Sequence, residues 1–164
     1  MGRSPVIKDL RRRLAEVDYS FQGELRSYQK EAVEAILRRH FGVLVAATGS
    51  GKAVIALEVI ARRRQLPLIL VHSRELMYQW EERVRQFLGV QAGLIGDSKF
   101  DIQPLSIAIV NTARKRLDEL VPRFGHLVVD ECHLVPATLF TGVVKKFDSC
   151  FPDSFGLLLS SSDK

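Results

Sequence analysis

Five short apolar runs, each continuous rather than alternating, constrain the fold of this 164-residue chain more than any other feature. Strands that are buried on both faces of a parallel sheet have this pattern, whereas half-exposed strands alternate apolar with polar residues. The runs lie at residues 42–47, 68–71, 107–110, 127–129 and 157–159. We therefore expect five strands of a parallel sheet whose two faces are both covered.

Amphipathic stretches of helical length accompany the apolar runs. They are residues 25–39, with Ser27 as candidate N-cap, 52–63, 74–87 and, more weakly, 137–147. Alternating strands and helices require right-handed crossovers, which predicts an α/β doubly wound domain with a mostly parallel central sheet and helices on both faces. The length suits one domain. We place it at residues 21–164 and expect residues 1–20, which are charged, to form a linker or a short helix.

Composition excludes several classes of protein. The chain has 24 Lys and Arg against 19 Asp and Glu, a net charge of +5, which favours a polyanionic partner without establishing one. Cys132 and Cys150 are too few for a disulfide framework and lack metal-ligand spacing. No apolar run approaches the roughly 20 residues needed to span a bilayer, and the first residues do not resemble a secretory signal. We expect a cytoplasmic protein with no membrane partner.

Residues 46–53, Ala-Ala-Thr-Gly-Ser-Gly-Lys-Ala, follow a predicted strand and open a predicted helix, which is the context of a P-loop. Small residues let backbone N–H groups turn around phosphates, and the helix N-terminus adds partial positive charge. Lys52 would contact the β- and γ-phosphates. The alternative is a glycine-rich turn that binds nothing. The predicted nucleotide-binding residues of this loop are Thr48, Gly49, Ser50, Gly51, Lys52 and Ala53.

Two residues of this loop depart from the usual P-loop. Ala46 replaces the first glycine, and Ala53 stands where a serine or threonine hydroxyl normally binds Mg²⁺. Magnesium keeps several waters, so a water can take the place of that hydroxyl. We expect nucleotide binding to survive and hydrolysis to be impaired.

Asp130-Glu131-Cys132-His133 stands at the end of the fourth apolar run. The carboxyl edge of a parallel strand lies near the phosphate loop in this architecture. Asp130 would hold Mg²⁺, directly or through water, and Glu131 would orient and deprotonate the attacking water. The alternative is an acidic strand end that caps the next helix. Paired with the loop, this motif predicts ATP and Mg²⁺ as ligands.

With both motifs in view, the chain resembles domain 1 of a superfamily 2 helicase of the DExH type, in the branch of XPB-like repair helicases and type III restriction subunits. The resemblance runs from about Leu25 to the end of the chain. It implies a RecA-like P-loop NTPase domain of a protein that couples ATP hydrolysis to movement on nucleic acid. It also implies contacts to the nucleic-acid backbone, with DNA favoured over RNA.

The resemblance assigns further residues. Residues 25–29, Leu-Arg-Ser-Tyr-Gln, match a segment in which the glutamine reads adenine, so Gln29 is the candidate base reader and Arg26 its helper. Residues 72–76 and 79–80 resemble motif Ia, which implies that Arg74 contacts the nucleic-acid backbone. Residues 110–112 resemble motif Ib, which implies that the Thr112 hydroxyl also contacts the nucleic-acid backbone. Arg114 follows this motif and is a candidate phosphate contact. The alternative for Arg74 is that it only begins an exposed helix. The alternative for motif Ib is that Asn111 or Thr112 is an ordinary helix N-cap.

His133 is implied to link the nucleotide site to motif III, where the match breaks. The family has Ser/Thr-Ala-Thr-Pro, whereas this chain has Ser160-Ser161-Ser162-Asp163. Ser160 and Ser162 keep hydroxyls for coupling, but the proline is missing. The sequence contains no second RecA-like domain with its arginine fingers. We therefore expect a fragment that hydrolyses ATP weakly or not at all alone, because such an arginine can contribute 10³–10⁵ in rate.

Two other functions stay open, and so does the role of the basic clusters. A nucleotide- or nucleic-acid-binding module that has lost catalysis would explain Ala53 and the altered motif III. An unrelated P-loop enzyme, such as a small kinase, would lack the Gln29 segment. The clusters at 38–40 and 62–64 are predicted to be solvated helix ends, whereas 114–116 is the better candidate for phosphate contact. Trp80 is predicted to be core.

Overall fold

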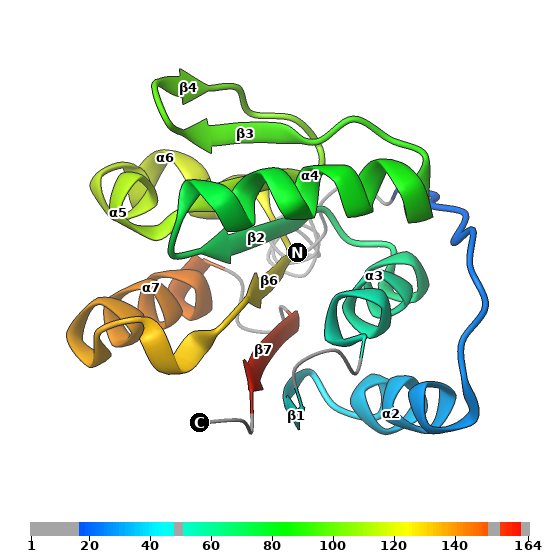
Figure 1. The fold of residues 1–164 in the computed structure, drawn as a ribbon. Helices are drawn as coiled ribbons and strands as arrows, with labels where there is room; N and C mark the ends of the chain where they lie inside the picture. Colours follow the sequence, from blue (N-terminus) through cyan, green and yellow to red (C-terminus); the bar gives the residue numbers. More distant parts are fainter. Residues whose placement is uncertain (1–16, 48–50, 151–154, 162–164) are drawn as a thin grey trace, which may run out of the picture.

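The computed structural model describes residues 17–47, 51–150 and 155–161, which form one seven-stranded sheet with helices on both faces (Figure 1). The strand order is β1-β7-β6-β2-β5-β3-β4. The strands are β1 (Phe41–Ala46), β2 (Pro67–Val71), β3 (Gly93–Gly96), β4 (Lys99–Phe100), β5 (Ser106–Ile109), β6 (His126–Val129) and β7 (Phe155–Ser161). The mostly parallel α/β sheet predicted from the apolar runs is confirmed.

The five predicted strands correspond to β1, β2, β5, β6 and β7, and each pairs in parallel with its neighbours. The β3–β4 hairpin was not predicted. β3 pairs in parallel with β5, and β4 pairs antiparallel with β3. Asp97 and Ser98 turn the hairpin with φ of 52° and 65°, a conformation that tight hairpins usually obtain from Asn-Gly. Because neither residue is glycine, the usual hairpin pattern is absent from the sequence.

Two helical layers cover the sheet. The helices are α2 (Ser27–Leu37), α3 (Lys52–Arg63), α4 (Arg74–Leu88), α5 (Val110–Ala113), α6 (Leu117–Leu120) and α7 (Ala137–Cys150), with 3-10 turns η1 (Arg114–Arg116), η2 (Val121–Arg123) and η3 (Cys132–Leu134). Each layer has its own core. On β2, Ile69 and Val71 pack under α2, α3 and α4, while Leu68 and Leu70 pack under the opposite layer with α7. Successive side chains of a strand point to opposite faces, so a continuous apolar strand supplies both cores.

β1 contradicts the expectation that both faces of every strand are buried. Its side chains alternate between exposed and half-buried, and Val43 and Val45 are each 59% exposed. Leu44 packs on the core beneath α2 and α3, whereas the opposite face of β1 has no helix over it in the described part of the chain. The apolar run therefore correctly predicted that β1 is a strand, but the prediction that both of its faces are buried is wrong.

The N-terminus of α2 also differs from the prediction. Ser27 is the first helical residue, and Arg26 occupies the N-cap position in extended conformation. The Gln29 side chain takes the capping role, since its Oε1 accepts a hydrogen bond of 2.8 Å from the Arg26 backbone N–H. This is half of a capping box, in which the third helical residue satisfies the N-cap donor. α3 begins at Lys52, as predicted.

Arg63 is buried, which corrects the interpretation of residues 62–64 as a solvated helix end. Its side chain leaves the end of α3 and reaches carbonyls at the C-terminus of α2, donating to Ile36 O at 3.0 Å and Arg39 O at 2.7 Å. The other terminal nitrogen lies 3.1 Å from His126 Nε2, and the guanidinium carbon lies 4.6 Å from the Phe155 ring centroid. One cation therefore joins two helices to the amino ends of β6 and β7.

His126 is neutral in this arrangement. Arg63 can only donate, so His126 Nε2 accepts and the ring proton sits on Nδ1, which has no partner among the described residues. Burial, and secondly the positive charge of Arg63, hold the pKa of His126 well below its ordinary value of 6.5. Protonation of the folded protein is therefore unfavourable compared with protonation of the unfolded chain.

We expect the free energy of unfolding to fall as pH drops below about 6.5, by up to about 1.4 kcal/mol per pH unit from His126 alone. In that range the unfolded chain binds a proton that the folded chain does not, which favours unfolding. Denaturant titrations between pH 7.5 and 5.0 measure the slope. His126→Gln keeps an acceptor for Arg63 but cannot titrate, so its free energy of unfolding should depend less steeply on pH. Equal pH dependence in the variant and the parent would contradict the assignment of His126 as a buried neutral histidine.

Candidate functional site

The sheet topology brings the phosphate loop and the acidic motif to one edge. The loop leaves the carboxyl end of β1, the acidic pair leaves the carboxyl end of β6, and β7 lies between these two strands. Lys52 and Asp130 line one hollow of about 330 Å³. The described residues that line it are Gly51, Lys52, Ala53, Val54, Leu76, Gln79, Arg83, Asp130, Glu131 and Ser161. Residues 48–50, also predicted to bind nucleotide, lie outside the described residues.

Ser161 connects the lysine to the acidic pair. Lys52 Nζ donates to Ser161 Oγ at 3.2 Å and to the Ala46 carbonyl at 3.4 Å. Ser161 Oγ in turn donates to Glu131 Oε2 at 3.3 Å. Ser161 was not among the predicted site residues, because the altered motif III directed attention to Ser160 and Ser162. Its position follows from the register, in which Ser161 pairs with Ala46 at the end of β1.

Asp130 is buried, with 7% of its surface exposed, and both carboxylate oxygens have donors. Oδ1 accepts the backbone N–H of Glu131 at 2.8 Å, and Oδ2 accepts the indole Nε1–H of Trp80, also at 2.8 Å. Burial raises the pKa of Asp130, while the Trp80 hydrogen bond and the charge of Lys52 oppose that rise. A buried carboxylate needs such partners to remain ionised. Trp80 is fully buried, in agreement with the core prediction.

Glu131 turns the chain sharply after β6. Its φ of 48° and ψ of 51° lie in the left-handed region, which costs a non-glycine residue roughly 1–2 kcal/mol. Strain of this kind is concentrated at functional sites. His133 Nε2 lies 3.5 Å from Glu131 Oε1, and His133 Nδ1 lies 3.1 Å from Ser160 Oγ. The structure thus brings together the predicted coupling residues His133 and Ser160, while Ser162 lies outside the described residues.

The donor set fits a magnesium ion held mainly by a nucleotide. Mg²⁺ is commonly bound by one or two carboxylates together with phosphates and waters. Asp130 and Glu131 supply those carboxylates beside Lys52, whereas Ala53 lines the hollow without a side-chain oxygen. Among the described residues no group of three or more acidic, histidine or cysteine side chains is gathered for a protein-only metal cage.

Gln29 lies against the phosphate loop. Its Nε2 packs so closely on Gly51 that a Cβ there would collide with it, and Gly51 has a φ of 81°, which only glycine adopts easily. Gln29 is buried, and its Oε1 accepts the Arg26 backbone N–H. The geometry thus leaves Gln29 beside the predicted nucleotide site, while the Arg26 side chain is exposed.

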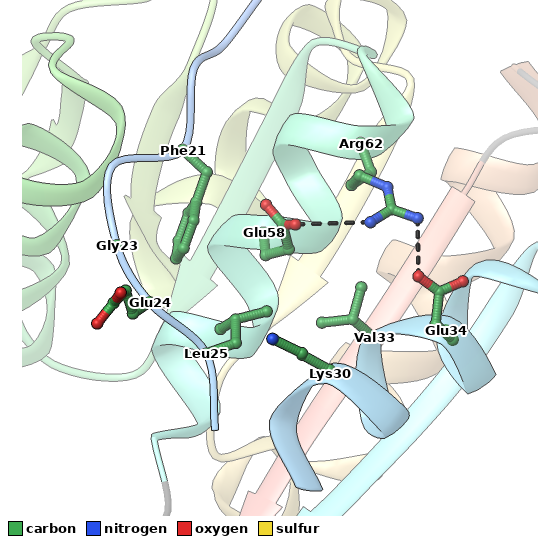
Figure 2. A pocket seen from close by; sticks show the side chains of 9 residues that line it. All are labelled: Phe21, Gly23, Glu24, Leu25, Lys30, Val33, Glu34, Glu58 and Arg62. Carbon is green, nitrogen blue, oxygen red and sulfur yellow. Dashed lines mark hydrogen bonds and ion pairs between the residues drawn. The ribbon is translucent and has the colours of Figure 1, made fainter. Parts of the chain in front are cut away.

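A larger hollow of about 530 Å³ lies between α2, α3 and residues 21–25 (Figure 2). Arg62 spans one side of it, 2.9 Å from Glu34 and 3.6 Å from Glu58. Phe21 and Val33 supply apolar surface. It contains neither Lys52 nor the acidic pair, so we do not place the phosphate chemistry there despite its size.

Comparisons with known proteins give the family. Residues 22–159 match the profile described as "Type III restriction enzyme, res subunit". The chain belongs to this family. The fold of this res-subunit family member is the N-terminal RecA-like domain of superfamily 2 helicases, as the sequence motifs had predicted.

Individual relatives agree with that assignment. The "DNA 3'-5' translocase XPB2" of Sulfurisphaera tokodaii is 33% identical over 126 residues, covering 77% of this chain and 29% of that protein. The "DNA 3'-5' helicase XPB" of Kineococcus radiotolerans is 32% identical over 127 residues, covering 71% and 23%. This res-subunit family member therefore spans less than a third of the length of these curated relatives.

Solved structures share the fold. The UvsW helicase from bacteriophage T4 superimposes with a TM-score of 0.69 at 22% identity, covering 99% of this chain and 61% of that one. The Sulfolobus solfataricus SWI2/SNF2 ATPase core, solved in complex with dsDNA, gives a TM-score of 0.64 at 15% identity, covering 93% and 34%. At these identities the likeness establishes the fold alone.

The three predicted nucleic-acid residues follow two neighbouring parallel strands. Arg74 opens α4 after β2, and Thr112 and Arg114 follow β5, so all three come from the carboxyl edge of the sheet. Arg74 is exposed and lies 3.5 Å from Glu75 and 3.7 Å from Asp97. Exposed pairs of this kind contribute about 1 kcal/mol or less, so a phosphate can replace them.

Gln79 and Arg83 of α4 are site residues that sequence reasoning missed. Together with Leu76 they form a stripe at positions i, i+3 and i+7, which faces the hollow. The stripe was detectable from helical spacing. Its direction was not, because the resemblance to motif Ia assigned residues 72–76 and 79–80 to the nucleic-acid side and gave no information on Arg83.

None of the helices in the described ranges has both the length and the apolarity needed to cross a membrane.

Proposed function

We propose that this chain is the ATP-binding half of a DExH-type helicase or translocase acting on nucleic acid. The observation that carries the proposal is the single hollow that Lys52, Asp130 and Glu131 share at the carboxyl edge of the sheet. ATP and Mg²⁺ are its proposed ligands. The loop and α3 N-terminus would hold the phosphates, and Gln29 with Arg26 would contact the base.

The residues of the chain support a division of labour. Lys52 is a point charge beside the phosphate loop, and its bond to Ser161 fixes the ammonium group near Glu131. Asp130, held by two donors, would ligate Mg²⁺, which would neutralise phosphate charge when bound. Glu131 is the proposed base that takes a proton from the attacking water, since its carboxylate faces the same hollow. The His133–Ser160 contact would transmit the state of this site to motif III.

Removal of the Lys52 charge tests the phosphate site. Lys52→Ala is expected to weaken ATP binding by about 10–100-fold, because a charge-assisted hydrogen bond of about 1.5–3 kcal/mol is lost. Calorimetric titration with ATP measures the affinity. Lys99→Ala, on the exposed β3–β4 hairpin, is the matched control and should bind as the parent does. ATP affinity that is equal in Lys52→Ala and the parent would exclude the phosphate-loop assignment.

A second function, a nucleotide-binding module without catalysis, is favoured by one observation. Ala53 faces the hollow with no oxygen for the metal. Both functions require ATP binding, and they differ in turnover. We propose that these residues alone hydrolyse ATP slowly. Rapid steady ATP turnover by the chain, stimulated by nucleic acid, would contradict slow hydrolysis. It would also exclude a nucleotide-binding module without catalysis.

We propose DNA as the nucleic acid, contacted through its backbone by Arg74, Thr112 and Arg114. The support is that the two XPB relatives are named as a DNA translocase and a DNA helicase, and that the SWI2/SNF2 core was solved with dsDNA. The net charge of +5 agrees with a polyanionic partner.

We also propose that the protein is located inside the cell, in the cytoplasm.

A further inference from the structure

Trp80 is the chain's only tryptophan, and it joins α4 to the acidic motif. The residue is fully buried, and its indole Nε1–H donates to Asp130 Oδ2 at 2.8 Å. The two residues are 50 positions apart in sequence. A buried indole N–H requires a partner, and a buried carboxylate requires donors, so this bond satisfies both.

The bond fixes the orientation of the Asp130 carboxylate. The other oxygen, Oδ1, accepts the backbone N–H of Glu131, so each oxygen has one donor from a rigid element. A carboxylate with both oxygens bonded in this way cannot rotate about its side-chain bond without breaking one contact. Each oxygen keeps a further acceptor position, and the residue lines the hollow that contains Lys52.

Trp80 is itself held rigidly. Met77 and Val84, one turn before and after it on the same face of α4, are also fully buried in the core beneath this helix layer. The adjacent stripe of Leu76, Gln79 and Arg83 borders the hollow directly. α4 thus forms a further wall of the site and reaches Asp130 through the indole, a role that none of the sequence motifs assigns to this helix.

We propose that Trp80 is a positioning residue for the magnesium site: its indole N–H holds Asp130 in the orientation that a nucleotide-bound Mg²⁺ requires. This inference rests on the proposed ATP site. Groups that orient metal-ligating carboxylates typically change metal affinity by 10–100-fold when removed. A purely structural Trp80, which uses Asp130 only to satisfy its own N–H, would instead affect stability without a selective effect on Mg²⁺.

The sharpest test removes only the N–H. Because Trp80 is the single tryptophan, incorporation of benzothienylalanine, in which sulfur replaces the indole N–H, changes this one position. ATP affinity is then measured in EDTA and across a Mg²⁺ series. We expect affinity in EDTA to stay within about twofold, while the Mg²⁺ concentration that gives the half-maximal effect rises about tenfold. Trp80→Phe, which also lacks the donor, should shift the Mg²⁺ dependence in the same direction.

A double substitution separates positioning from structure. In an Asp130→Ala background the analogue should cause no additional change in Mg²⁺ dependence, because the group that it positions is already gone. An unchanged Mg²⁺ midpoint in the analogue, or an equal loss with and without Mg²⁺, overturns the proposal. The proposal is also overturned if the analogue shifts the Mg²⁺ midpoint by the same factor in the Asp130→Ala background as in the parent.

A second readout needs no nucleotide. The nucleotide-free chain gives one indole N–H resonance in a proton–nitrogen NMR spectrum, and we expect Asp130→Ala to move it upfield. Glu131→Gln, which leaves the bond intact, is the control. An indole resonance that ignores Asp130→Ala overturns the positioning role by itself. If the parent chain binds no ATP, the proposed function fails, while this resonance still tests the bond.

Discussion

Arg63→Ala is expected to lower the free energy of unfolding by about 3–5 kcal/mol, because it breaks a buried hydrogen-bond network and leaves the buried His126 Nε2 without its donor. The Ile36 carbonyl keeps the Arg39 backbone N–H but loses the guanidinium, the half-buried contact to the Arg39 carbonyl is lost, and the contact with the Phe155 ring disappears. Burial lowers the pKa of Arg63 to about 10, so the side chain is still charged at neutral pH. Denaturant unfolding monitored by circular dichroism measures the loss.

The neighbouring Arg62 is a matched control. It lies on the same turn of α3 but is 45% exposed and pairs with Glu34 and Glu58 at the surface. Arg62→Ala should cost about 1 kcal/mol or less. Arg63→Lys, which keeps the charge but has only one nitrogen, should fall between the two. Equal stability of Arg62→Ala and Arg63→Ala would show that the Arg63 cluster does not hold the helices to the sheet.

Glu131→Gln is expected to slow ATP hydrolysis by about 10²–10⁴-fold, the range that a positioned general base contributes. The amide keeps the shape of the side chain and removes its basicity. Binding of Mg²⁺-ATP should change by less than about threefold, since Asp130 and Lys52 keep their places. Because the parent rate is expected to be low, single-turnover hydrolysis with protein in excess and DNA present is the suitable measurement.

The control for Glu131 is Glu82→Gln, an exposed acid on α4 that does not line the hollow. This variant should hydrolyse ATP at the parent rate. If Glu131→Gln also hydrolyses at the parent rate, another group activates the water. A loss of ATP binding in Glu131→Gln would instead assign the residue to ligand binding.

Much of the fold was predictable because buried parallel strands are continuous in sequence. The five runs became β1, β2, β5, β6 and β7, and the 52–63 helix matches α3. The β3–β4 hairpin was missed because β3 contains two glycines among its four residues and β4 is only two residues long. The exposure of β1 was missed because hydrophobicity marks a strand without saying whether a helix lies over both faces.

The candidate site was predictable to the extent that it is local in sequence. Gly51, Lys52 and Asp130 belong to short motifs, so their types and order indicated phosphate and metal chemistry without coordinates. No motif placed Ser161, Gln79 or Arg83 at the nucleotide site, which all three line. Their place depends on strand register and on the direction of a helix face, both of which result from packing over long sequence distances.

The sequence by itself determined the class of the sheet and the family, and it predicted the phosphate loop and the acidic pair. These are encoded in neighbouring residues, whose periodicity and spacing are visible along the chain. Only the tertiary structure decided that a buried arginine joins α2 to β6, that Ser161 links Lys52 to Glu131, and that Trp80 donates to Asp130. Such contacts form between residues distant in sequence, so each depends on how the whole chain packs.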